Sequence, residues 1–121
     1  MKRIGLAAAM LFAAVLAGGA AQAADVGGTY DVYGTNFDGS HYKGTATISG
    51  GEASCQIAWK TGDSSSSGIC MLSGDVFAAA YALGSDVGLA LYSVHDDGTL
   101  DGIWTIEGQK GQGTEVLTPA N

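Results

Sequence analysis

Apolar and polar residues alternate one by one along several short stretches of this 121-residue chain. Between Cys55 and Lys60, for example, Cys55, Ile57 and Trp59 fall on one side, and Gln56, Ala58 and Lys60 fall on the other. This period of two is typical of a β-strand with one buried face and one face in water. Beyond residue 23, no stretch of helical length carries a 3.6-residue apolar period. The pattern therefore predicts an all-β protein.

Turn signals divide the chain into about eight such stretches. From Gly28 onward, glycine-containing turns recur at a spacing of about 8 to 12 residues, which is typical of a sandwich or barrel. Short connections leave no room for crossovers, so we expect a single antiparallel up-and-down β-barrel of about eight strands, in which closure removes the strand edges. The expected strands are residues 29–35, 42–49, 53–60, 68–72, 76–83, 87–95, 99–107 and 114–118.

The fifth and sixth expected strands are apolar on both faces. One face of each strand is expected to line the core. The other face, which carries Ala78 and Ala80, is either a weakly polar surface of small residues or a contact with a subunit or partner. We therefore regard Ala78 and Ala80 as candidate partner-binding residues.

Cys55 and Cys70 are the two cysteines of the chain, and they lie symmetrically about a turn near Gly62 and Asp63. If this segment folds back as a hairpin, the two cysteines face each other across the strand pair at a separation that suits a disulfide. We therefore expect a Cys55–Cys70 disulfide, worth about 3 kcal/mol for a closed loop near 15 residues.

The first 23 residues have the three parts of a secretory signal peptide, with Lys2 and Arg3 at the start, an apolar run, and small residues before Ala24. We expect cleavage before Ala24, which leaves one domain of residues 24–121 in the periplasm or outside the cell. Without the leader, the chain keeps three lysines and no arginine against 12 acidic residues, a formal charge of −9. This acidity disfavours nucleic acids and anionic membrane surfaces as partners.

The polar residues form no motif that predicts catalysis. His41 and His95 belong to no HExxH or His-x-His pattern, and with both cysteines in a disulfide they cannot supply the three or four ligands of a zinc site. The serines at residues 64–67 lie outside any G-x-S-x-G motif and are expected to form a flexible hairpin tip.

One acidic cluster is a candidate site for acid–base catalysis or for calcium. Adjacent side chains on a turn point apart, and the calcium-loop pattern is absent around Asp96, Asp97 and Asp101. We therefore expect a protein that is not an enzyme, uses no cofactor and holds no metal.

Aromatic side chains are the main candidates for a ligand site. They either fill the barrel or line an open mouth, as in lipocalins and streptavidin. Because a domain of this size divides into short strands, we expect a shallow interior, in which a ligand is small or held at the rim. The candidate residues are Tyr30, Tyr42, Trp59, Tyr92 and Trp104.

Several segments resemble known proteins. Gly28-Thr29-Tyr30 is similar to the start of the first strand of lipocalins and avidins, which implies a calycin-like barrel. The segments GTYDVYGTNFDGSHYKG, DGTLDGIWT and GTEVLTP more closely resemble small exported bacterial proteins, some of which are labelled fibronectin-binding-like. This resemblance implies a β-barrel and export, and it implies no catalytic residue.

Two classes of function fit these observations. The first is an exported binding module for a protein partner or a small apolar ligand, with a homodimer through the apolar outer face also open. The second is an inhibitor of an extracytoplasmic hydrolase, such as a protease or lysozyme, which would insert residues 24–27 or 64–67 into an active site.

Overall fold

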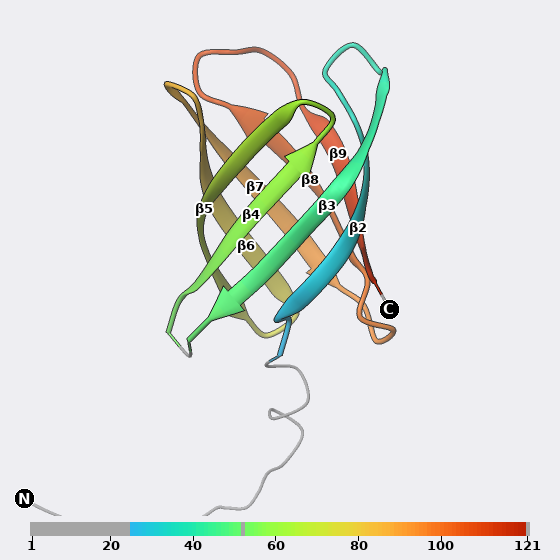
Figure 1. Ribbon diagram of the computed structural model, residues 1–121, viewed down its shortest axis with the longest axis vertical. Coiled ribbons are helices and arrows are strands. Elements are labelled where there is room, and N and C mark those ends of the chain that lie inside the picture. The colour runs from blue at the N-terminus through green and yellow to red at the C-terminus, as the bar shows by residue number, and fades with distance from the viewer. Residues whose placement is uncertain (1–24, 52, 121) are drawn as a thin grey trace, which may run out of the picture.

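A computed structural model describes residues 25–51 and 53–120, and these residues form a closed antiparallel barrel in which every strand pairs with its sequence neighbours (Figure 1). β2 and β9 close the barrel by pairing with each other. The predicted all-β, up-and-down antiparallel barrel of about eight strands is confirmed. The predicted signal peptide, residues 1–23, lies outside the described residues. The strands are β2 (Gly28–Thr35), β3 (His41–Gly50), β4 (Cys55–Thr61), β5 (Ser64–Ser73), β6 (Val76–Leu83), β7 (Asp86–Val94), β8 (Leu100–Ile106) and β9 (Gly113–Pro119).

The predicted hairpin between the cysteines is also confirmed. Cys55 on β4 lies directly opposite Cys70 on β5, with the two Cα atoms 4.9 Å apart, and the side chains form a disulfide. Gly62 and Asp63 form the tight turn between the strands, and Gly62 has a φ of 57°, a value that favours glycine. The covalent link lies in the wall of the barrel, where Cys70 is buried.

The prediction that residues 64–67 form a flexible tip is wrong. These serines begin β5, and their partners on β4 run from Thr61 to Ala58. The physical reason is that the two-residue turn fixes the register at once, so that backbone pairing starts directly after it whatever the side chains are. As a consequence, Ser66 is half-buried on the inner face and Ser65 is exposed on the outer face.

One end of the barrel is filled by apolar side chains. Figure 1 places the N-terminal described residues, the C-terminus and the β5–β6 turn at this end. The side chains of Phe77, Leu100 and Leu117 are fully buried there. Val26, just before β2, is also buried, and its carbonyl accepts a hydrogen bond of 2.6 Å from the Tyr30 hydroxyl. We call this the closed end.

The opposite end carries the β2–β3, β4–β5, β6–β7 and β8–β9 connections (Figure 1). Aromatic rings, together with Leu83 and Ile106, occupy the interior near this end, and several of the rings lie over inward-facing glycines of the neighbouring strand. Tyr81 on β6 is paired with Gly88 on β7, and a Cβ atom at Gly88 would overlap the Tyr81 ring. Trp104 on β8 has the same relation to Gly113 on β9. Glycine at these positions makes room for the rings in a narrow barrel.

Candidate functional site

A buried carboxylate lies among the aromatic rings near the open end. Alternate residues of β9 face inward, and Gly113, Glu115 and Leu117 are all buried. Glu115 has only 5% of its surface exposed, and it is the one buried charged residue in the described part of the chain. A charged group is rarely buried to this degree unless it has partners.

Three neutral donors surround this carboxylate. The Tyr42 hydroxyl donates to Oε1 at 2.7 Å, whereas Trp59 Nε1 and the Tyr92 hydroxyl donate to Oε2 at 2.8 Å and 2.6 Å. The donors come from β3, β4 and β7, so the network ties three strands to β9 across the interior. The carboxylate oxygens of Glu115 accept all three of these hydrogen bonds.

The tyrosines around Glu115 are held in their neutral form. Burial, together with the charge of Glu115, raises the pKa of Tyr92 and of Tyr42 well above the usual tyrosine range. Burial and the same charge raise the pKa of Tyr81 to about 12. At neutral pH these hydroxyls therefore remain protonated and able to donate.

A cavity of about 310 Å³ adjoins this network at the open end. This volume is at the lower limit of the pockets that hold small ligands. The Trp59 and Tyr81 rings meet edge to face at 5.2 Å, so part of the wall is a packed aromatic surface. Polar side chains from the β2–β3 loop and from the β4–β5 hairpin complete the rim. The lining includes Asn36, Tyr42, Trp59, Thr61, Ser64, Ser66, Tyr81, Tyr92, Trp104 and Glu115. We call this the mouth cavity.

The β2–β3 loop covers part of the mouth. Phe37, in this loop, stacks on Trp104 with ring centroids 4.8 Å apart, and Trp104 Nε1 donates to the Thr114 carbonyl at 3.2 Å. The loop itself is shaped by Asp38, whose carboxylate accepts hydrogen bonds from the backbone and side chain of Ser40. The loop at the rim of the mouth cavity is therefore ordered by its own hydrogen bonds.

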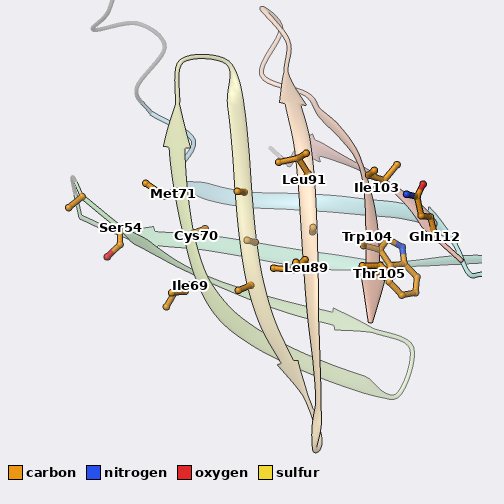
Figure 2. Close-up of a pocket in the computed structure, with 15 residues that line it drawn as sticks. Ser54, Ile69, Cys70, Met71, Leu89, Leu91, Ile103, Trp104, Thr105 and Gln112 are labelled. Atoms are coloured by element: carbon orange, nitrogen blue, oxygen red, sulfur yellow. The ribbon is translucent and has the colours of Figure 1, made fainter. Parts of the chain in front are cut away.

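A second hollow lies on the outer surface, across β5 to β8, and has a volume of about 630 Å³ (Figure 2). Its large side chains are strongly exposed, for example Ile69 at 63% and Leu89 at 60%. Although this hollow is larger than the mouth cavity, it offers almost no polar group to orient a small molecule. We call it the outer apolar face, defined by Ile69, Met71, Ala78, Ala80, Leu89, Leu91 and Ile103.

The structure brings four of the five predicted aromatic candidates together. Tyr42, Trp59, Tyr92 and Trp104 line the mouth cavity. Tyr30 does not reach this cavity, because its side chain points into the closed end and its hydroxyl donates to the Val26 carbonyl. The predicted partner residues Ala78 and Ala80 are half-buried in the outer apolar face.

Sequence reasoning missed Glu115, and it did not include Tyr81 among the site residues. The signal for Glu115 was present in the alternation of the last strand, where a glutamate occupies a position between inward-facing Gly113 and Leu117. A charged residue on the apolar side of a strand is a candidate for a buried functional group.

The remaining polar candidates lie on the surface. His41 stacks on the exposed Tyr33, and His95 lies 3.8 Å from Asp101 at the edge of β8. Asp97 accepts a hydrogen bond from the Thr99 backbone, and this bond lowers the pKa of the Asp97 carboxyl. Within residues 25–51 and 53–120, no group of three or more His, Cys, Asp or Glu side chains is arranged to hold a metal ion.

No family model and no curated protein matches this chain. Solved structures do match. A redesigned β-barrel is similar with a TM-score of 0.68 and 17% identity, over 79% of this chain and 92% of that one. The redesigned β-barrel mFAP1, bound to DFHBI, is similar with a TM-score of 0.65 and 20% identity, over 82% of this chain and 97% of that one. The REP1-NXSQ fatty acid transporter is similar with a TM-score of 0.55 and 15% identity, over 81% of this chain and 98% of that one. At these identities the likeness shows the barrel fold.

In the part of the chain that the structure describes, no helix has the length and apolar character needed to cross a membrane.

Proposed function

We propose that this chain is an exported, non-enzymatic binding module that holds a small, largely apolar ligand in the mouth cavity. The observation that carries the proposal is a preformed aromatic cavity with a buried carboxylate, that of Glu115, in its wall. A few placed polar groups within an apolar lining is the usual composition of a small-molecule site. Barrels of similar fold with bound DFHBI, or named as a fatty acid transporter, support this use of the interior.

A pair of serine variants tests the location of the site. Ser66→Phe adds a ring at a half-buried inner position of the mouth cavity, whereas Ser65→Phe adds the same ring at an exposed outer position next to it. Titration with small apolar compounds, followed by tryptophan emission, should give a saturable change in the wild type and in Ser65→Phe. The change should be absent in Ser66→Phe. Equal binding by both variants would place the site elsewhere.

Several parts of the proposal rest on the sequence. Removal of residues 1–23, a periplasmic or secreted location and the lack of enzymatic activity follow from the leader and from the absence of catalytic motifs. The similarity to small exported bacterial proteins, including those labelled fibronectin-binding-like, supports export in the same way. Mass spectrometry of the mature protein from the cell envelope would find Ala24 at its N-terminus if the leader is cleaved as proposed.

The outer apolar face favours a second candidate, contact with a protein partner or a second copy of the chain. Large contiguous apolar surfaces are uncommon on monomers unless they serve an interaction. Ala80→Asp and Leu89→Asp place a charge in this face, and Thr45→Asp places the same charge on an exposed position of β3. A dimer on a sizing column that only the first two variants dissociate would support the contact, and a monomeric wild type would exclude a homodimer.

The hydrolase-inhibitor alternative needs a segment free to enter an active site. Residues 64–67 are part of β5, and Val26 is buried in the closed end. Both proposed inserting segments are therefore engaged in the barrel, which favours ligand binding over inhibition. Inhibition of a protease or lysozyme by the purified protein would reverse this preference.

A further inference from the structure

The mouth cavity contains a negative charge that no cation of the described chain balances. Glu115 accepts hydrogen bonds from three neutral groups, and within residues 25–51 and 53–120 no lysine forms a salt bridge with it, while His95 and Asp101 lie 3.8 Å apart at the other end of the barrel. A buried carboxylate is stabilised most strongly by a positive charge. The chain therefore leaves a place for a cation beside Glu115.

The hydrogen bonds of Glu115 limit how such a cation can bind. An ionised carboxylate offers about four acceptor positions. Oε2 already receives Trp59 and Tyr92, whereas Oε1 receives only Tyr42. One acceptor position on Oε1 remains, which suits a single ammonium donor rather than the two parallel donors of a guanidinium.

The walls of the cavity suit the rest of such a ligand. Trp59, Tyr81 and Trp104 line the same space as Glu115. Aromatic faces attract cations, most strongly where water is excluded, and they also pack against apolar groups. A volume of about 310 Å³ admits only a small molecule.

We propose that the mouth cavity selects a small organic ammonium ion, with an apolar or aromatic body against the rings of Trp59, Tyr81 and Trp104 and one N–H group donating to Oε1 of Glu115. This inference rests on the proposed function, and it specifies the chemical class of the ligand for the same cavity. Binding involves no covalent step.

Two probes of equal size separate charge from shape. Phenethylamine is an ammonium ion at neutral pH, and 2-phenylethanol has the same body with a neutral hydroxyl. In calorimetric titrations of the wild-type protein, phenethylamine should bind about tenfold more tightly than 2-phenylethanol, and the difference should be retained at moderate salt. This comparison needs no variant and therefore does not depend on the folding of one.

Matched variants assign the preference to Glu115. Glu115→Gln removes the charge at the wall of the cavity and should bring the two probes to within about twofold of each other. Glu107→Gln removes one charge from an exposed position in the β8–β9 connection and should keep the tenfold preference. Thermal melts followed by circular dichroism establish that each variant is folded.

The outcomes separate this inference from the proposed function. Equal binding of the two probes by the wild type, both blocked by Ser66→Phe, would overturn the ammonium preference and leave a ligand-binding cavity. A preference for phenethylamine that Glu107→Gln reduces as much as Glu115→Gln would mean general attraction to an acidic protein, and it would also overturn the inference. No binding of either probe would contradict both proposals.

Discussion

Glu115 is the residue on which the interior of this barrel depends. The residue is 5% exposed, and the cost of burying its carboxylate is offset by hydrogen bonds from Tyr42, Trp59 and Tyr92. Because each donor belongs to a different strand, the network also fixes the positions of the rings that line the mouth cavity. The charge that is proposed to bind a ligand is thus the same group that organises the site.

Tyr92→Phe should lower the free energy of unfolding by about 1.5 to 3 kcal/mol, because it removes one of two donors to Oε2 and leaves that oxygen less well satisfied. Urea denaturation followed by tryptophan emission measures the change. Tyr33→Phe is the control, since Tyr33 is 47% exposed and lies outside the network, and it should change stability by less than about 0.5 kcal/mol. Equal effects of the two substitutions would contradict this description of the network.

Stability should also fall at alkaline pH. The pKa of Tyr81 is raised to about 12, and the pKa values of Tyr42 and Tyr92 are raised as well. Tyrosine in an unfolded chain loses its proton near pH 10. Above about pH 10 the unfolded state therefore binds fewer protons than the folded state, so the free energy of unfolding decreases as pH rises.

Urea midpoints measured from pH 8 to pH 12 test this dependence, with phenolate absorbance recorded on the same samples. The midpoint should be constant below about pH 10 and decline above it, and most phenolate should appear only as the barrel unfolds. Ionisation of all tyrosines near pH 10 in the folded protein would be inconsistent with the buried network.

At the scale of elements, the β4–β5 hairpin is the best-defined unit. Its turn, register and disulfide are mutually consistent, because the Gly62 turn sets Cys55 opposite Cys70. The chain-entropy account assigns about 3 kcal/mol to a loop of this length. A double Cys55→Ala, Cys70→Ala variant should therefore be less stable than the oxidised protein by about 2 to 3 kcal/mol in urea denaturation.

Reduction of the wild type supplies the control for this variant. The reduced protein should match the double variant in stability, since both lack the link and both leave a small apolar group at these positions. If oxidised and reduced proteins unfold at the same urea concentration, the disulfide has no role in stability.

The pairing of Tyr81 with Gly88 across β6 and β7 makes a separate prediction. Gly88→Ala places a methyl group where the Tyr81 ring lies, so it should destabilise the barrel by about 1 to 3 kcal/mol. Gly51→Ala, at an exposed position in the β3–β4 connection, should change stability by less than about 0.5 kcal/mol. Thermal melts compare the stability of the two variants. If Gly88→Ala were as stable as the wild type, the Tyr81 ring would have moved aside without loss of stability.

The sequence predicts the strands better than it predicts the site. Alternation and glycine turns identify every strand, because both signals are local and one face of each strand is buried. The prediction of a flexible tip at residues 64–67 is wrong, since this part of β5 is specified by pairing with β4 rather than by its own side chains. The convergence of Tyr42, Trp59, Tyr92 and Glu115 was not predicted because it depends on the shear and closure of the whole barrel.

The molecule as a whole has two surfaces suited to binding and one end that is closed. Phe77, Leu100 and Leu117 fill the closed end, so a ligand can enter the interior only from the mouth. The outer apolar face lies on the barrel wall and is available to a partner independently of the mouth (Figure 2). The proposed ligand and the proposed partner would therefore bind at separate places on the barrel.

The most direct test of the central claim is an NMR titration of the wild-type protein with phenethylamine, observed at the backbone amide and tryptophan indole N–H signals. Binding in the mouth cavity should shift the indole signal of Trp59, which donates to Glu115, and should leave the amides of Ile69 and Met71 in the outer apolar face unchanged. Shifts confined to the outer apolar face, or an unchanged Trp59 indole signal at saturating probe, would contradict the account.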